Sequence, residues 1–273
     1  MIEVKNLTKR YGSKTAVSNV SFTAEESEIL GFLGPNGAGK STTMNILTGY
    51  LSSTEGEAKI NGIDILEEPV KAKQMIGYLP EQPPLYLDMT VMEYLKFVYG
   101  LKKCKLPINS HLKEICNLVK ITDVKDRVIK NLSKGYKQRV GLAQALVGNP
   151  PVLILDEPCA GLDPKGRDTI LNLIKEYQSQ MGNTVLFVSH SMEDVAKLCK
   201  KVIVMNKGKL AFCGSVNEVY SHGDELKKMG LNVPEITDIF LKLKASGIDC
   251  RTDIYTVEQG VEEYKRLLAG GAY

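Results

Sequence analysis

One short segment constrains this chain more than any other. Residues 34–41 fit the pattern GxxxxGK[ST], directly after the apolar run Ile29 to Leu33 and at the start of a predicted helix over 39–48. Glycines in such a loop let successive backbone N–H groups turn toward phosphate oxygens at a helix N-terminus, where the helix dipole also favours negative charge. The alternative is a glycine-rich turn that only packs a helix against a strand. Because every constrained position is filled, we expect a phosphate-binding loop formed by Gly34, Pro35, Asn36, Gly37, Ala38 and Gly39.

The three residues that follow this loop predict what it binds. Lys40 supplies a mobile cation for the β- and γ-phosphates of a nucleotide, the Ser41 hydroxyl ligates Mg²⁺, and Thr42 adds a phosphate contact.

A second motif supplies what hydrolysis of a bound nucleotide requires. The apolar run Val152 to Leu155 is followed by Asp156 and Glu157. A strand that ends in an acidic residue places Asp156 at the carboxyl edge of the sheet, where it can hold Mg²⁺ through water, and Glu157 would polarise the attacking water. The alternative is that the two acids only cap the following loop. That interpretation would suit an isolated Asp-Glu pair, and it is less favoured here because the chain also carries Lys40.

Strand-like and helical segments alternate along the chain, which predicts an α/β fold with a largely parallel sheet. The strand-like runs are 2–4, 17–22, 29–33, 76–79, 152–155, 184–188 and 201–205, and the amphipathic helices are 39–48, 90–101, 109–120, 136–148, 165–180 and 191–199. Between about Gln82 and Asn149 only helices are expected. We therefore expect a domain over 1–220 with a helical subdomain inserted at about 83–150.

The last part of the chain shows a different pattern. Two apolar stripes with helical spacing occur after residue 221, the first at positions 236, 239, 240 and 243 and the second at 257, 261, 264 and 268. Residues 221–273 are thus expected to form a small C-terminal helical extension.

Composition excludes several classes of protein. The 35 basic and 32 acidic residues leave a net charge of +3, which gives no electrostatic footprint for nucleic acid. No apolar run approaches the ~18 residues of a membrane helix, and the N-terminus lacks the pattern of a signal peptide. The six cysteines are scattered without a CxxC pair, so neither a zinc site nor a disulfide framework is indicated. We expect a cytoplasmic protein with no nucleic-acid partner.

A third motif narrows the family. Residues 132–136, Leu-Ser-Lys-Gly-Tyr, precede a helix and lie shortly before the acidic strand, and at this point the chain resembles the ATP-binding subunits of ABC transporters, whose signature reads LSGGQ. The resemblance implies a P-loop NTPase core and ATP with Mg²⁺ as the ligands. It also implies that Ser133 and Gly135 contact the phosphate of an ATP held by another subunit. Lys134 and Tyr136 depart from the common Gly and Gln.

Further positions match the same family. The resemblance implies that Tyr11 stacks on adenine, that Gln82 reaches Mg²⁺ and links the site to the helical subdomain, and that His190 contacts the γ-phosphate. Taken alone, the tyrosine would be an ordinary strand residue and the histidine a helix cap. Asp163 matches the acid of the loop through which family dimers communicate, and Cys159 stands where threonine is usual. Glu157, His190 and Gln82 form the expected catalytic set.

The two halves of the chain resemble different branches of this family. Up to about Leu155 the chain is similar to ATPases of the gliding-motility and drug-resistance exporter branch. From about Ala160 onward, including the tail motif at 231–237, it is similar to the ATPases of energy-coupling factor importers, in which a C-terminal helical extension helps the subunits dimerise.

The function implied is that of an ATP-hydrolysing subunit whose two copies, or one copy and a related ATPase, close on two MgATP and drive a separate integral membrane permease from the inner face of the cell membrane. A soluble ABC-type ATPase that acts on ribosomes or DNA is the first alternative. Such proteins usually carry two of these domains, a long coiled-coil insertion or a basic face, none of which the sequence shows. The second alternative is a module that binds nucleotide without hydrolysing it. The presence of Glu157, Gln82 and His190 argues against that alternative.

Overall fold

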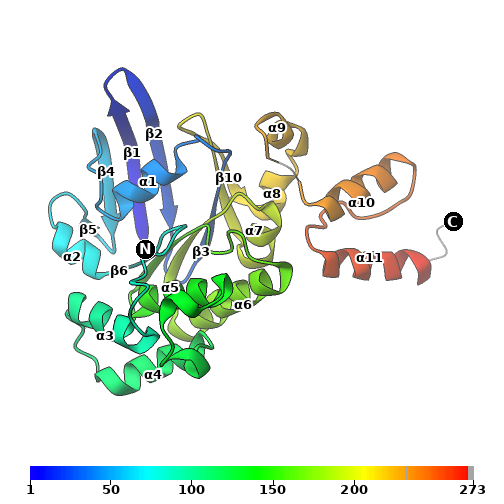
Figure 1. The fold of residues 1–273 in the computed structure, drawn as a ribbon. Coiled ribbons are helices and arrows are strands. Elements are labelled where there is room, and N and C mark those ends of the chain that lie inside the picture. The colour runs from blue at the N-terminus through cyan, green and yellow to red at the C-terminus, as the bar shows by residue number, and fades with distance from the viewer. Residues whose placement is uncertain (232, 270–273) are drawn as a thin grey trace.

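The computed structural model describes residues 1–231 and 233–269. Asn232 and residues 270–273, all within the expected extension 221–273, lie outside the described residues. A six-stranded sheet with the order β10-β9-β3-β8-β7-β6 forms the centre of the molecule (Figure 1). All neighbouring pairs in it are parallel except β10 with β9, which confirms the expected largely parallel sheet. Its strands are β3 (Ile29–Leu33), β6 (Ile76–Leu79), β7 (Val152–Asp156), β8 (Thr184–Val188), β9 (Lys201–Asn206) and β10 (Lys209–Ser215).

The edge strand β10 was not predicted from the sequence. It pairs antiparallel with β9 because only Lys207 and Gly208 separate the two strands, and both have a positive φ, of 48° and 77°. Two consecutive residues with positive φ form the tight turn that suits a hairpin.

A second sheet was also not predicted. It has four strands in the order β2-β1-β4-β5, all paired antiparallel. The strands are β1 (Ile2–Tyr11), β2 (Lys14–Ala24), β4 (Glu55–Ile60) and β5 (Ile63–Asp64). The first two runs that we read as strands therefore belong to this sheet, because the short Gly12–Ser13 connection permits only antiparallel pairing.

The two faces of the central sheet pack against different cores. In β7, Val152 and Ile154 belong to the core shared with the antiparallel sheet and helix α1 (Lys40–Leu47), whereas Leu153 and Leu155 belong to the core under the remaining helices. Alternate residues of a strand point to opposite faces, so a strand buried on both faces is continuously apolar. This is why the run could be recognised in the sequence.

Residues between β6 and β7 are helical, with helix α2 (Pro69–Gln74) just before β6. They form α3 (Val91–Leu101), α4 (Ile108–Leu118) and α5 (Lys134–Leu146), with two short 3₁₀ turns at Thr122–Val124 and Ile129–Asn131. Ser133 is the N-cap of α5, and its side chain accepts a hydrogen bond from the backbone N–H of Tyr136 at 3.4 Å. The signature segment is thus itself the start of a helix, which begins two residues before the predicted start at 136 because Ser133 caps it.

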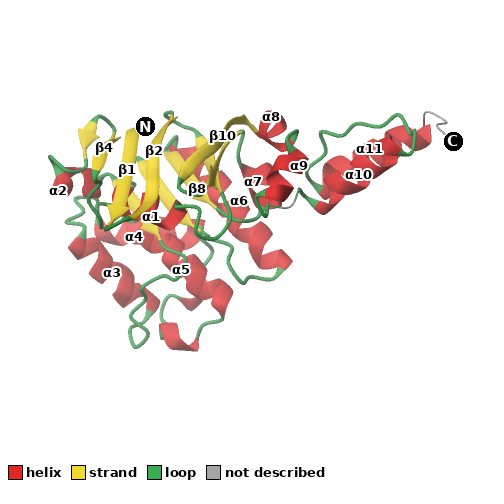
Figure 2. Ribbon diagram, turned by 90° about the horizontal axis from the view of Figure 1, so that it is seen from above, coloured by secondary structure: helices red, strands yellow, loops and turns green. Residues whose placement is uncertain are grey.

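The remaining helices follow β7. They are α6 (Pro164–Met181), α7 (Met192–Leu198), α8 (Val216–Tyr220), α9 (Gly223–Lys228), α10 (Glu235–Ala245) and α11 (Val257–Ala269). Figure 2 shows α10 and α11 side by side, projecting from the body. No helix in residues 1–231 and 233–269 is long and apolar enough to span a membrane.

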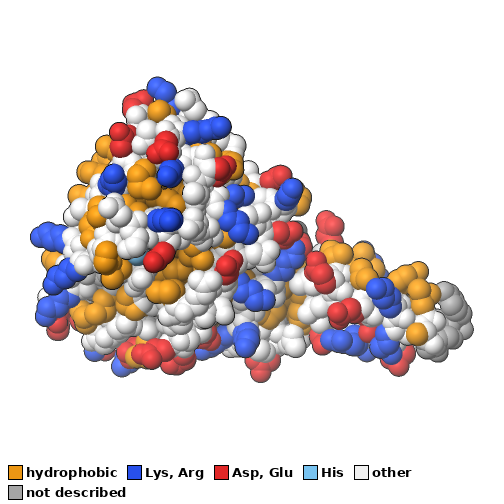
Figure 3. Space-filling view, turned by 90° about the horizontal axis from the view of Figure 1, so that it is seen from below, with side chains coloured by type: hydrophobic (Ala, Val, Ile, Leu, Met, Phe, Trp, Pro, Cys, Tyr) orange, Lys and Arg blue, Asp and Glu red, His pale blue; other side chains and the backbone are white. Residues whose placement is uncertain are grey.

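Both expected helical stripes lie in these last helices, but much of their apolar surface is exposed. Figure 3 shows apolar side chains gathered on the projecting extension. In the second stripe Val257 is 56% exposed and Tyr264 is 59% exposed, whereas Phe240 of the first stripe is buried. An amphipathic helix that leaves its apolar face in water indicates an unpaired contact surface.

Candidate functional site

The phosphate-binding loop connects β3 to α1, and its glycines are required by the space around them. A Cβ on Gly34 would lie 2.6 Å from the backbone oxygen of Met205, and one on Gly39 would lie 2.7 Å from that of Ala16. Gly39 is the N-cap of α1 with a positive φ of 101°, no side chain caps this helix end, and its first turn carries no acidic residue. The first N–H groups of α1 are therefore left to bind an anion.

Lys40 lies inside this loop. Its side chain is buried, and its ammonium donates hydrogen bonds to the backbone oxygens of Gly34 at 2.5 Å and Pro35 at 3.3 Å. Burial lowers the pKa of Lys40, although nearby Glu157, Asp156 and Glu81 act in the opposite direction. The loop therefore encloses a cation that is held by backbone carbonyls of the loop itself.

The acidic pair follows β7 at the same edge of the sheet. Strand β8 lies between β3 and β7, so the ends of all three strands meet there. Burial raises the pKa of Asp156 to about 6, and the carboxylates of Glu157 and Glu81 add to the shift while Lys40 opposes it. A carboxylate at this edge is the residue type that can hold Mg²⁺, but among residues 1–231 and 233–269 no group of three His, Cys, Asp or Glu side chains is arranged to hold a metal ion, so Asp156 would need ligands other than a cluster of acids.

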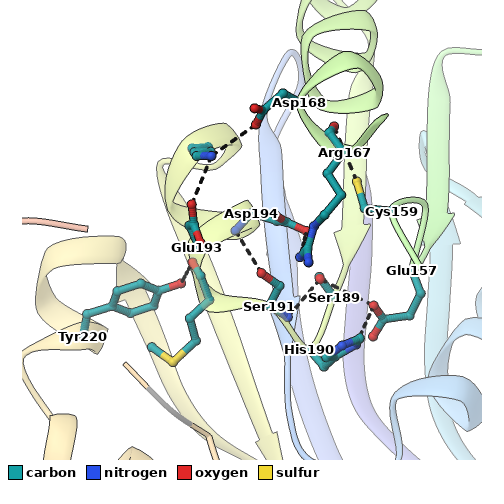
Figure 4. Close-up of polar contacts among 12 residues, drawn as sticks. Glu157, Cys159, Arg167, Asp168, Ser189, His190, Ser191, Glu193, Asp194 and Tyr220 are labelled. Atoms are coloured by element: carbon teal, nitrogen blue, oxygen red, sulfur yellow. Dashed lines mark hydrogen bonds and ion pairs between the residues drawn. The ribbon is translucent and has the colours of Figure 1, made fainter. Parts of the chain in front are cut away.

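Glu157 and His190 are in direct contact. Oε2 of Glu157 lies 2.8 Å from Nδ1 of His190 and 3.5 Å from the Ser189 hydroxyl (Figure 4). The backbone of Glu157 has a positive φ of 47°, and its N–H donates to the backbone oxygen of Val188 at 2.9 Å. The Glu157 side chain is 13% exposed, whereas His190 is 67% exposed. The loops after β7 and β8 thus hold the carboxylate in place and leave the histidine accessible.

A second polar contact lies beside this pair. Arg167 at the start of α6 donates to the buried carboxylate of Asp194 on α7 at 2.7 Å (Figure 4). Asp163 is the N-cap of α6 and accepts a hydrogen bond from the N–H of Gly166 at 3.1 Å. Burial raises the pKa of the Cys159 thiol to about 12, so this cysteine is an unreactive core residue in the folded chain. The ion pair ties together the segments that follow Glu157 and His190.

Two cavities adjoin the phosphate loop. One, of about 640 Å³, is lined by loop residues 36–42, by Tyr11 and by Lys14, Lys207 and Gly208. Tyr11 is 46% exposed and lies in the same cavity as the loop, where the expected adenine contact requires it. The other cavity, of about 680 Å³, is lined by Gly34, Glu157 and His190, and also by residues 233–236 of the extension.

The sequence patterns did not point to several residues around these cavities. Glu81 adjoins the acidic pair, and the turn at Lys207–Gly208 packs on the loop, where the Gly208 N–H donates to the Ala38 oxygen at 3.0 Å. The turn could have been predicted from the sequence, because the Asn206–Lys209 stretch, with glycine at 208, is typical of a hairpin turn.

Three predicted site residues are not brought to these cavities within one subunit. Gln82 is exposed and lines a separate cavity with residues of α5, while Ser133 and Gly135 lie at the N-terminus of α5 and line neither cavity beside the phosphate loop. Within a single chain, the phosphate loop, the acidic pair and His190 lie together, whereas the signature segment 132–136 of the same chain lies elsewhere.

A family model described as "ABC transporter" matches residues 17–160, more than half of the chain. The chain belongs to the ABC transporter ATP-binding family. It is an ATP-binding and ATP-hydrolysing subunit of this family, with the cassette fold.

Similar ABC ATPases come from both branches that the sequence resembles. The energy-coupling factor transporter ATP-binding protein EcfA2 of Caldanaerobacter subterraneus subsp. tengcongensis is 36% identical over 280 residues, covering 98% of each chain. The linearmycin resistance ATP-binding protein LnrL of Bacillus subtilis is 35% identical and covers 88% of this chain and 78% of its own.

Two solved structures of ABC cassettes have the same fold. CbiO1 of Clostridium perfringens, part of the ABC transporter complex cbiONQ, has a TM-score of 0.75 at 30% identity, covering 88% of this chain and 98% of its own. The dimeric post-hydrolysis state of the cassette MJ0796, bound to ADP and Pi, has a TM-score of 0.72 at 27% identity, covering 79% of this chain and 99% of its own.

Proposed function

We propose that this ABC ATPase dimerises around two MgATP, with an identical copy or a related ATPase, and drives an integral membrane permease of the energy-coupling factor importer type. Its place is then the inner face of the cell membrane, where the permease holds it. The observation that carries this proposal is the division of the site within one chain. Lys40, Glu157 and His190 adjoin the phosphate loop, while Ser133 caps a helix outside both cavities of that loop.

In this proposal a second subunit supplies the signature segment that is missing from the phosphate-loop cavities of the first. The N-terminus of α5 carries Ser133 as its cap and no acidic residue in its first turn, so it can face a phosphate held by the partner. The cassette MJ0796 is a dimer in its structure with ADP and Pi. The exposed apolar face of α10 and α11 offers a further contact surface between subunits, because apolar side chains there remain in water in the single chain.

The residues of the site divide the chemistry among them. Ser41, Asp156 and Gln82 would hold Mg²⁺, which would neutralise charge on the phosphate oxygens. The N–H groups of residues 34–42 and the Lys40 ammonium bind the phosphates, and Tyr11 stacks on the adenine. The Glu157 carboxylate accepts the proton of the attacking water, and His190 contacts the γ-phosphate and fixes Glu157 through the 2.8 Å contact.

The similarity over the whole chain supports the choice of permease. The similarity to EcfA2 extends over 98% of this chain and therefore includes the extension. The name of LnrL refers to drug resistance instead, and that alignment covers less of the chain. We therefore assign the extension and the partner to the importer branch.

A mixing experiment tests the dimer. Ser133→Arg and Lys40→Ala subunits should each be inactive as homodimers. In a mixed dimer both lesions fall at one interface and the other interface is intact. We expect the mixture to regain ATPase activity that neither variant shows alone. If Ser133→Arg alone keeps full activity that does not depend on protein concentration, the segment 132–136 does not close on ATP and the dimer mechanism is wrong.

Fractionation of the source cells tests whether this chain associates with a membrane permease. The tagged chain should sediment with membranes and be released together with one integral membrane protein after mild detergent. Sedimentation with ribosomes, or recovery without a membrane protein, would contradict the proposal and favour the alternative of a soluble ATPase.

A further inference from the structure

Gln138 is a buried polar residue whose amide nitrogen is left without a partner among the described residues. It lies on α5 five residues after Ser133, and it is 4% exposed. Among the described residues its Nε2 has no hydrogen-bond partner. A buried amide N–H that makes no hydrogen bond costs folding free energy, so an unpaired one in a native structure indicates a role other than stability.

The face of α5 that carries Gln138 packs on the loop of Gln82. A Cβ on Gly141 would lie 2.6 Å from Cγ of Pro83, so only glycine allows the helix and the loop to approach this closely. One turn further on, Nε2 of Gln144 donates to the backbone oxygen of Tyr78 at 3.5 Å. Gln138 lies three residues before Gly141, and residues three apart are neighbours on a helix surface, so Gln138 lies next to the Gly141–Pro83 contact on the side nearer the signature.

Gln138 and Gln82 line the same cavity. It has a volume of about 300 Å³ and lies between α5, the loop that contains Gln82 and Pro83, and Ala160. The cavity lies beside both the loop and the unpaired amide. Gln82 is exposed in the present arrangement, and within the described part of the chain the Gln138 amide N–H donates no hydrogen bond to it.

We propose that Gln138 is a positioning residue that couples Gln82 to the signature end of its own subunit. Its amide donates a hydrogen bond to an oxygen of residues 81–83 when Gln82 engages the nucleotide site. That bond fixes the loop relative to α5, and therefore fixes Gln82 relative to Ser133. The inference rests on the role proposed above for Gln82, and it extends that role to a residue that does not touch nucleotide.

The variant Gln138→Met removes the amide and keeps the length of the side chain. We expect the melting temperature without nucleotide to be unchanged or higher, because an unpaired buried polar group is lost. Affinity for ATP should remain near that of the wild type. The kcat of the full chain should fall about tenfold, the size expected for one lost hydrogen bond. Stability that holds while turnover falls separates positioning from a structural role.

Tyr177→Phe is the matched control. The hydroxyl of Tyr177 on α6 is also buried and unpartnered among the described residues, but it lines none of the cavities near the phosphate loop. This variant should likewise keep or raise the melting temperature, and its kcat should match the wild type. A fall in kcat with Tyr177→Phe as large as that with Gln138→Met would show that loss of any buried polar group slows turnover, and would overturn the inference.

A double-mutant cycle with Gln82→Ala decides whether the two glutamines act together. If they do, Gln138→Met should reduce kcat in the wild type and have little further effect in the Gln82→Ala background. Equal losses in both backgrounds, an unchanged kcat for Gln138→Met, or a kcat that falls only with the melting temperature would each overturn the inference. If Gln82→Ala lowers kcat while Gln138→Met does not, the inference fails and the role of Gln82 stands. A normal kcat for Gln82→Ala contradicts both.

Discussion

The Glu157 carboxylate and Nδ1 of His190 lie 2.8 Å apart although 33 residues separate them in the chain. The contact arises because β7 and β8 are adjacent parallel strands, in which Asp156 is paired with Val188. Glu157 follows the first strand and His190 the second at the same edge of the sheet. A carboxylate and an imidazole so placed form a unit in which the ring restricts the direction of the carboxylate.

Glu157→Gln should retain MgATP binding and lose turnover. We expect a fall of roughly 10²- to 10⁴-fold, the usual contribution of a general base. A dimer that depends on ATP should then accumulate, because the site closes but does not hydrolyse. Gel filtration with and without ATP measures this. A monomer peak that does not shift, together with near-normal hydrolysis, would remove Glu157 from the role.

His190→Ala should act through the same unit. It should reduce single-turnover hydrolysis in the wild type, but add much less in the Glu157→Gln background, because residues that work as one unit are not additive. Ser189→Ala is the control, since its hydroxyl is only 3.5 Å from the same carboxylate oxygen and should contribute little. Fully additive losses would show that His190 acts independently of Glu157.

Lys40→Met should abolish hydrolysis and weaken nucleotide binding while the fold survives. The side chain keeps its length but loses the charge that faces the β- and γ-phosphates. The ammonium is buried against the backbone oxygens of Gly34 and Pro35, and burial lowers its pKa, so its charge adds little to stability. Thermal melts with and without MgATP measure both effects. If the melting temperature falls equally in both conditions, Lys40 is structural.

Asp156→Asn should stabilise the protein in the absence of nucleotide and magnesium, in a manner that depends on pH. The pKa of Asp156 is raised from 3.8 to about 6, so the folded state binds the proton more tightly and stability falls as pH rises through this window. The gain for Asn should be on the order of 2–3 kcal/mol above pH 6 and vanish below about pH 4. Urea unfolding in EDTA at several pH values measures it. A gain of the same size at every pH would show that the buried negative charge of Asp156 is not what destabilises the folded chain.

The features that could be predicted from the sequence are local ones. The loop at 34–41 follows a strand and opens a helix, Ser133 begins α5, and Asp156 ends β7, each as the pattern predicts. These features depend on residues that are neighbours in the chain, where glycine conformation, helix capping and continuous apolar runs act directly. The second sheet was missed for the opposite reason: β4 has only two buried residues, Ala58 and Ile60, and its long partner β1 is distant in sequence.

Which of these local features come into contact depends on how the whole chain folds. The order of the strands brings Glu157 to His190. Burial, with the nearby charges of Glu157 and Glu81, raises the pKa of Asp156. The packing of α5 on the Gln82 loop likewise leaves the Gln138 amide buried and, among the described residues, unpaired. Burial, charge crowding and unpaired groups are properties of a residue's surroundings in space, and those surroundings come from segments far apart in the chain.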